Sequence, residues 1–310
     1  MIKVRASQRG VALVLVIWLG ALLMVIASSF IFAARTDSFV IRNSMSMARA
    51  EALADAAVQR AVFETYRTDN APEMWRRDGT PRPWVFDGTT ILVELRDESA
   101  KIDLNTASDT LLRGLLVSVG LKDEEADKLL DAILDWRDPD TLRRPNGAEE
   151  PDYRAAGLTY APANSPFQAI EELQLVLGMR PDIYRRIAPL VTVYSRQAGV
   201  YPLTATREVL MAIPGMTAEI VDGYIARREA ARAAGEPVPA FPEAGAYAAP
   251  PTSLVASIKA TARLDDGTVF VRDAVALLRP VPQRPVTFLA WRAATAPEPK
   301  PAEGEEKVRN

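Results

Sequence analysis

The stretch VALVLVIWLGALLMVIASSFIFAA, from Val11 to Ala34, contains no charged residue and no proline. About 20 apolar residues are enough for a helix to cross the hydrocarbon core of a bilayer. Lys3, Arg5 and Arg9 precede the stretch with no acidic residue among them, so the positive-inside rule predicts a cytoplasmic N-terminus. We therefore predict a membrane-spanning helix here, with the rest of the chain on the far side of the membrane.

The helical pattern continues beyond the apolar stretch. No proline occurs between Val11 and Arg67, and apolar residues recur at three- and four-residue spacing from Asp37 to Tyr66. We predict one helix over 11–67, whose first half lies in lipid and whose second half packs on a folded domain. A coiled-coil stalk is the alternative, but the apolar face is rich in alanine and lacks the repeated leucines of a heptad seam.

The composition excludes several classes of function. The chain of 310 residues contains no cysteine and no histidine, which removes disulfide frameworks, Ser-His triads and zinc sites with histidine ligands. Its net charge of −3 argues against a general nucleic-acid binder.

Two pairs of strand-like segments flank a helical middle. Segments 84–86 and 90–95 flank Asp87-Gly88, and 254–264 and 268–278 flank another Asp-Gly turn; both patterns are typical of hairpins. Helical periodicity between them covers 107–118, 123–136, 166–177, 181–190, 205–212 and 218–233. This order predicts an α+β fold with a helical domain inserted between strands. We also expect 191–194 to form a strand that returns toward the sheet.

Two segments resemble helix-hairpin-helix units. One follows KIDLNTA at 101–107, and the other covers 200–228. Such units can hold a DNA phosphate with the amide groups of a turn and a helix N-terminus. Acidic residues at both second helices oppose that use, so we interpret the units as packing modules and keep DNA binding as the alternative.

An acid-rich segment, DWRDPDTLRRPNGAEEPDY, covers 135–153. Its prolines and glycine predict a loop, and hard oxygen ligands on a loop suit calcium. Arg143 stands where an EF-hand loop requires glycine, which argues against that motif. The alternative is a solvated loop in which the acids pair with neighbouring arginines.

The N-terminus resembles the class III signal of type IV pilins and pseudopilins, because the polar SQRG at 7–10 leads directly into the apolar helix. The resemblance implies that a prepilin peptidase cuts between Gly10 and Val11, and that Val11 becomes an N-methylated first residue. The alternative is a plain membrane anchor. Leu15 occupies the position where this family usually has a glutamate.

Four further motifs, in order, are similar to those of the K-type minor pseudopilins of type II secretion: DESAKIDLNTA at 97–107, DWRDPD at 135–140, GAEE at 147–150 and NSPF at 164–167. Glu150 departs from the aspartate usual in the family. The resemblance implies a pilin fold with a large helical insertion, and the following predicted division: leader 1–10, pilin helix 11–67, first pilin part 68–104, inserted domain 105–190, second hairpin-like part and linker 191–249, C-terminal pilin strands 250–292 and disordered tail 293–310.

The resemblance also implies calcium in the acid-rich segment. The predicted ligands are Asp138, Asp140, Glu149, Glu150 and Asp152, with Asp135 in reserve, and Trp136 and Tyr153 are expected to be packing anchors.

The expected function is structural rather than enzymatic. The resemblance implies a tip subunit of the secretion pseudopilus, held in the inner membrane with its soluble part in the periplasm. Its expected partners are the I and J minor pseudopilins, the prepilin peptidase and the inner-membrane assembly platform. The alternatives are a DNA-binding pseudopilin of an uptake apparatus and a membrane-anchored enzyme that uses the carboxylates of 138–152.

Overall fold

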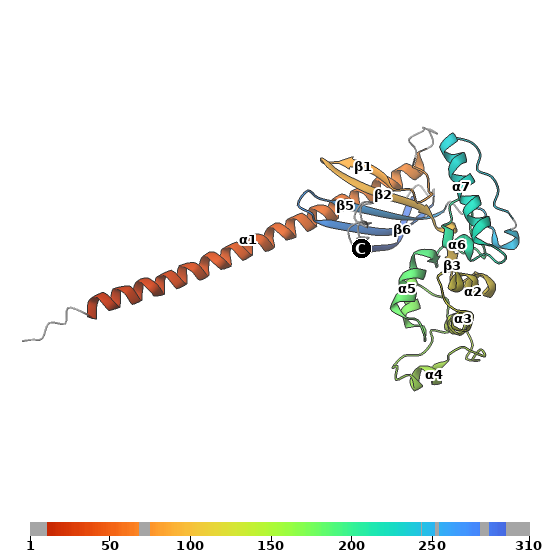
Figure 1. The fold of residues 1–310 in the computed structure, drawn as a ribbon, viewed down its shortest axis with the longest axis horizontal. Coiled ribbons are helices and arrows are strands. Elements are labelled where there is room, and N and C mark those ends of the chain that lie inside the picture. The colour runs from red at the N-terminus through yellow and green to blue at the C-terminus, as the bar shows by residue number, and fades with distance from the viewer. Residues whose placement is uncertain (1–10, 68–74, 243, 252–253, 280–284, 296–310) are drawn as a thin grey trace, which may run out of the picture.

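The computed structural model describes residues 11–67, 75–242, 244–251, 254–279 and 285–295. One helix, α1 (Val11–Tyr66), runs unbroken through the apolar stretch and beyond it, which confirms the predicted long helix. Its N-terminal part projects from the rest of the molecule, and its C-terminal part lies against a sheet (Figure 1). The helix stays continuous because no proline interrupts its hydrogen-bond ladder.

Five antiparallel strands form this sheet in the order β1-β2-β5-β6-β7. They are β1 (Arg82–Phe86), β2 (Thr89–Asp97), β5 (Val255–Arg263), β6 (Val269–Leu278) and β7 (Val286–Ala294). Both predicted hairpins are confirmed, since β1 pairs with β2 and β5 pairs with β6. Gly88 supplies the positive φ of 72° at the first turn, which glycine adopts without strain.

Small side chains bring α1 close to the sheet. Ala50, Ala54, Ala57 and Ala61 lie on one face of the helix and are fully buried in a core shared with the strands. Arg272 of β6 reinforces the contact by donating to Asp55 Oδ1 and Glu51 Oε1 on α1, each over 2.6 Å. The C-terminal half of α1 and the sheet therefore fold as one module.

A helical insertion lies between β2 and β5. Its helices are α2 (Asp109–Ser118), α3 (Asp123–Arg137), α4 (Glu150–Ala155), α5 (Pro181–Ile187), α6 (Arg207–Met211) and α7 (Ala218–Ala234), with 3₁₀ turns η1 (Glu98–Ala100), η2 (Ile170–Leu175), η3 (Ala188–Leu190) and η4 (Gly245–Tyr247). These elements surround a core of their own, distinct from the core under α1. The insertion sits at the end of the sheet farthest from the projecting part of α1 (Figure 1).

The segment 191–194 does not return to the main sheet, so that prediction was wrong. Strand β4 (Val191–Thr192) pairs in parallel with β3 (Ile102–Asp103) in a separate two-stranded sheet within the insertion. Local sequence indicates strand propensity but does not specify the partner strand.

The predicted helix at 166–177 was also wrong, because only the short turn η2 forms there. The side chain of Asn105 binds both backbone groups of Phe167: Phe167 N donates to Oδ1 over 2.8 Å, and Nδ2 donates to Phe167 O over 2.9 Å. This long-range pair holds the start of the segment outside a helix.

Two further predictions need correction. The acid-rich segment is not a loop throughout, because α4 begins at Glu150 with Pro151 in its first turn, where proline sacrifices no helical hydrogen bond. Strand β7 lies largely within the predicted C-terminal strands at 250–292, where no separate strand was specified, and it ends at Ala294, inside the predicted tail. The leader at 1–10 and residues 296–310 lie outside the described residues.

Candidate functional site

The acid-rich segment is organised around a buried carboxylate, Asp135, in the last turn of α3. Asp135 is fully buried, and the backbone N–H of Arg144 donates to it over 3.3 Å. A Cβ atom at Gly147 would lie 1.9 Å from Asp135 Oδ2, so only glycine permits this approach of backbone to carboxylate. The segment therefore closes back on the end of α3.

Three more carboxylates gather near Asp135. The pKa of Glu149 is raised, first by burial and then by the charges of Asp135, Asp138 and Asp140. Burial likewise raises the pKa of Asp138, and Asp140 raises it further. The pKa of Asp135 is raised by burial and, less strongly, by Asp138. Carboxylates that raise one another's pKa values form an electrostatically unfavourable group unless a cation joins them. Arg144 partly offsets the repulsion, because its Nε lies 3.5 Å from Asp135 Oδ1 and 3.8 Å from Asp138 Oδ2.

Two oxygens of this group lack the partners that buried polar atoms normally have. Asp138 Oδ1 and Glu149 Oε1 are buried with no hydrogen-bond partner among the described residues. A buried unsatisfied oxygen costs roughly 1–3 kcal/mol. Carboxylate oxygens are the ligands that calcium prefers, so the chemistry of the group fits this ion.

The other two predicted ligands have different partners. Glu150 is exposed and forms an ion pair with Arg154. Asp152 accepts from the backbone N–H of Glu149 over 3.0 Å and from Arg143 over 3.2 Å. Within the described part of the chain, no three carboxylates are disposed to hold a metal ion as the side chains now lie. Calcium binding would thus require the side chains of Asp138 and Glu149 to turn toward a common point.

Aromatic packing anchors the loop, as expected. Trp136 and Tyr153 are buried with ring centroids 6.2 Å apart, and Phe167 stacks on Trp136 at the same separation. Tyr153 Oη accepts from Leu177 N over 2.9 Å. These contacts fix both ends of the acidic segment to the core of the insertion.

The motif at 97–107 is the joint between the sheet and the insertion. Asp103 is buried and accepts from Asn105 N over 2.9 Å, Ser195 Oγ over 3.2 Å and Arg196 N over 2.8 Å. With the Asn105–Phe167 pair, this network joins segments that are about 60 and 90 residues apart in the chain. These motif residues therefore have structural roles.

Three arginines that were not predicted from the sequence hold the loop at 202–205, and one of them, Arg96, comes from the sheet. Arg228 of α7 donates to the carbonyls of Pro202 and Ala205 over 3.1 and 2.8 Å. Arg232, one turn later on α7, donates to Leu203 O, and Arg96 of β2 donates to Thr204 O over 3.2 Å. We call these three residues the arginine clamp. The i, i+4 spacing of the two α7 arginines was the only sequence signal that could have indicated it.

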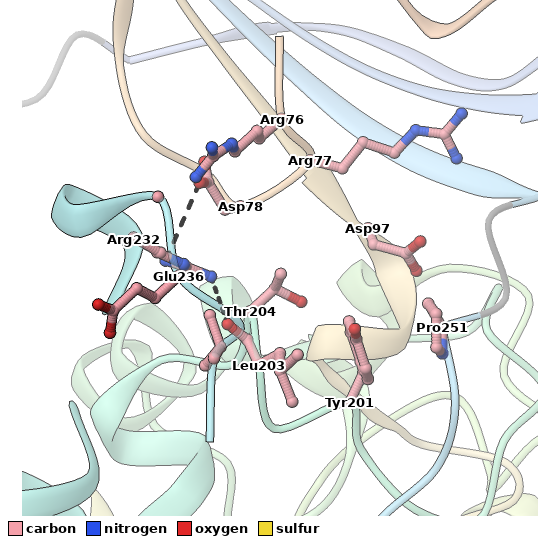
Figure 2. A pocket seen from close by; sticks show the side chains of 12 residues that line it. Arg76, Arg77, Asp78, Asp97, Tyr201, Leu203, Thr204, Arg232, Glu236 and Pro251 are labelled. Carbon is pink, nitrogen blue, oxygen red and sulfur yellow. Dashed lines mark hydrogen bonds and ion pairs between the residues drawn. The ribbon is translucent and has the colours of Figure 1, made fainter. Parts of the chain in front are cut away.

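Figure 2 shows this junction, where Arg232 lies between Asp78 and Leu203. A cavity of about 450 Å³ opens beside it, with acidic and basic side chains on its wall, among them Arg76, Asp97 and Glu236. Because both signs of charge are interspersed, the cavity does not favour one class of charged ligand. We interpret it as the seam between the two modules.

The hairpin-like units serve packing. In the first turn Gly120 N donates to Val117 O and Leu121 N to Leu116 O, so these amides are not available to a phosphate. In the second turn, Met216 N donates to Ile213 O. The two units meet at Gly114, where a Cβ atom would lie 2.0 Å from the carbonyl oxygen of Ala212.

The N-terminal processing residues are only partly described. Gly10 lies outside the described residues, and Val11 begins α1. Leu15 is exposed, as are the other described apolar side chains of this part of α1. Within the described chain, α1 is the helix that is both long enough and apolar enough to cross a membrane.

Comparisons with known proteins agree on one family. The family model described as type II secretion system (T2SS), protein K matches residues 92–196. Type II secretion system protein K of Pseudomonas aeruginosa is 29% identical over 244 residues, which cover 70% of this chain and 73% of that protein. The protein of the same name from Pectobacterium carotovorum is 28% identical, over 60% of this chain and 63% of that protein.

A solved structure has the same fold. It is described as the GspK-GspI-GspJ complex from the type 2 secretion system of enterotoxigenic Escherichia coli. The matching chain has a TM-score of 0.55 and 18% identity, over 85% of this chain and 99% of its own length. The match supports an α+β fold with a long N-terminal helix, an antiparallel sheet and a helical insertion.

Proposed function

Because the chain belongs to the type II secretion system protein K family, we propose that it is the minor pseudopilin at the tip of the secretion pseudopilus. There it initiates or caps assembly, for protein export from the periplasm across the outer membrane. Family membership makes the chain a structural protein with no catalytic role.

The location of the insertion is the observation that supports a position at the tip. It sits on the end of the sheet opposite the projecting part of α1 (Figure 1). In a filament whose subunits stack along their long helices, a bulky module at this end blocks the addition of another subunit above it. The protein therefore occupies the last position of the filament.

Leu15 supports the same position. An apolar residue there means that this subunit supplies no carboxylate to the terminal ammonium of a neighbour within lipid. An unpaired charge in hydrocarbon is costly, about 2.5–3.5 kcal/mol even on the lower scales. A subunit at the tip has no need of that carboxylate.

We further propose the partners and location that follow from this role. The I and J minor pseudopilins bind the chain, by analogy with the GspK-GspI-GspJ complex. A prepilin peptidase cuts between Gly10 and Val11, Val11 is then N-methylated, and the inner-membrane platform takes up the processed subunit. Before assembly α1 spans the inner membrane once, with the sheet and insertion in the periplasm.

Calcium binding belongs to the proposal. The ligands are Asp138 and Glu149, whose buried oxygens lack partners, together with the nearby Asp135 and Asp140. Glu150 and Asp152 keep their protein partners and are not among the proposed calcium ligands. The test is whether calcium raises the midpoint of thermal unfolding.

The function is tested by deleting the gene and measuring secreted hydrolases and DNA uptake in the same strain. We expect the hydrolases to remain in the periplasm while uptake stays normal, with secretion restored by the wild-type gene. Lost uptake with normal secretion would instead assign the protein to a DNA-uptake apparatus. Immunogold labelling of overproduced pseudopili tests the position, because label spaced along whole filaments contradicts a tip subunit.

A further inference from the structure

A second cavity, of about 390 Å³, lies where the insertion meets the far end of β5, β6 and β7. Its apolar lining comes from both modules: Phe167 and Val193 from the insertion, and Leu254, Val255, Leu277 and Leu289 from the sheet module. Its volume is in the range of cavities that accept a ligand or a large side chain. Leu254 is 47% exposed and Leu289 38% exposed, so apolar surface remains open to solvent at the cavity.

A β-bulge places Leu289 at this cavity. Val275 of β6 pairs with Ala290, whereas Ala276 pairs with Phe288, so Leu289 is the extra residue of β7. A bulge changes the direction of a side chain relative to the regular alternation of a strand. Without it, the register would place a different side chain of β7 at the cavity wall.

Two arginines also line the cavity, Arg196 from the insertion and Arg279 just after β6. Both are exposed, and neither forms an ion pair with any described residue. Most other exposed arginines of the insertion have a carboxylate partner, as Arg180 and Arg207 do. The cavity wall therefore combines apolar side chains with the polar Gln168, Tyr194 and Ser195 and with two arginines that have no ion-pair partner among the described residues.

The backbone of Arg196 is held in an uncommon conformation. Its φ is 54°, in the left-handed region that side chains other than glycine rarely adopt. The conformation is held by the bond from Arg196 N to the buried carboxylate of Asp103 over 2.8 Å. Local strain of this kind persists only where the surroundings fix it, so the position of Arg196 at the cavity is specified by the joint between the modules.

Strand β7 offers a backbone template beside the cavity. It is an edge strand of the five-stranded sheet, and its outer side has no partner among the described strands. An extended peptide can add to such an edge through main-chain hydrogen bonds while its side chains enter adjacent pockets.

We propose that this cavity docks an extended segment of a protein partner. A large apolar side chain of the segment enters the cavity, and an adjacent carboxylate of the same segment pairs with Arg196 and Arg279. The choice of an acidic segment rests on charge complementarity with the two unpaired arginines. The proposal concerns the surface of this chain and stands independently of the role in secretion.

The test uses the full-length protein in detergent micelles and a short fluorescein-labelled peptide that alternates leucine and aspartate. Its matched twin has asparagine in place of aspartate. By fluorescence anisotropy we expect saturable binding of the aspartate peptide, and dissociation constants about tenfold higher for the asparagine twin, a difference of about 1.4 kcal/mol. Leu289→Ala should weaken binding of both peptides.

Arg196→Gln and Arg279→Gln should each weaken binding of the aspartate peptide but leave that of the asparagine twin unchanged. Arg263→Gln is the matched control, because Arg263 is also exposed but lies at the other end of β5. Thermal melts verify that every variant is folded. The proposal is overturned by equal binding of the two peptides to the wild type, by the absence of saturable binding, or by equal losses in the control and cavity variants.

Discussion

The carboxylates near the end of α3 predict opposite responses of stability to pH with and without calcium. The pKa values of Asp135, Asp138 and Glu149 are raised in the folded state, chiefly by burial. A carboxyl group with a raised folded-state pKa favours the folded state when it is protonated. In chelator, the contribution of these three groups to stability should therefore be largest below the ordinary pKa values of about 4, and it should fall as the pH rises through the raised values.

Calcium should reverse this trend, because it binds the ionised carboxylates of the folded protein. A ligand present at 100 times its dissociation constant adds about 2.7 kcal/mol to the free energy of unfolding. For domains of this size about 1 kcal/mol shifts the midpoint by 2–4 °C, so we expect calcium at neutral pH to raise it by roughly 5–11 °C. The gain should shrink as the pH is lowered and the carboxylates are protonated.

Two variants distinguish calcium binding at this site from a general effect of removing a negative charge. Asp138→Asn should raise the midpoint in chelator, since it removes one of the repelling charges, and should abolish most of the rise with calcium. Glu150→Gln is the matched control and should leave the calcium response intact, because Glu150 is exposed and paired with Arg154. Differential scanning calorimetry of the wild type decides the question: equal midpoints in calcium and in chelator at neutral pH refute the reasoning.

Two further predictions concern the packing of the insertion. Gly114→Ala should destabilise the protein by about 1–3 kcal/mol, because the new Cβ would lie 2.0 Å from the carbonyl oxygen of Ala212. Gly223→Ala is the control, because this position in α7 has room for the methyl group. In chemical denaturation it should raise the free energy of unfolding by up to about 1 kcal/mol. Equal decreases for the two variants would contradict this account. Asn105→Asp should cost about 1–3 kcal/mol in the same assay, because it sets a carboxylate against Phe167 O, and an unchanged midpoint would show that the pair is dispensable.

The most accurate sequence predictions were those that depend on neighbouring residues. The long helix followed from an apolar stretch and the absence of proline, and both hairpins followed from Asp-Gly turns between strand-like segments. The acidic segment was recognised by its composition, and the motif at 97–107 by its resemblance to that of the K-type family, although its role as a joint was not predicted. Each of these features is encoded within a few turns or strands of chain, where spacing determines which side chains share a face.

The tertiary structure decided which distant residues meet. Glu149 is buried near Asp135 while its neighbour Glu150 is exposed, a distinction that depends on where α4 begins. Strand β4 pairs with β3, and Phe167 is held out of a helix by Asn105 across the insertion.

The arginine clamp and the bulge at Leu289 were likewise decided only by the fold. In the clamp, Arg232 donates to Leu203 O and Arg96 donates to Thr204 O. Both arginines lie far from this loop in the sequence. The sequence by itself determined the long apolar helix, the two hairpins and the composition of the acidic segment. Contacts between distant segments decided the rest, because burial and partner choice depend on how the whole chain packs rather than on local periodicity.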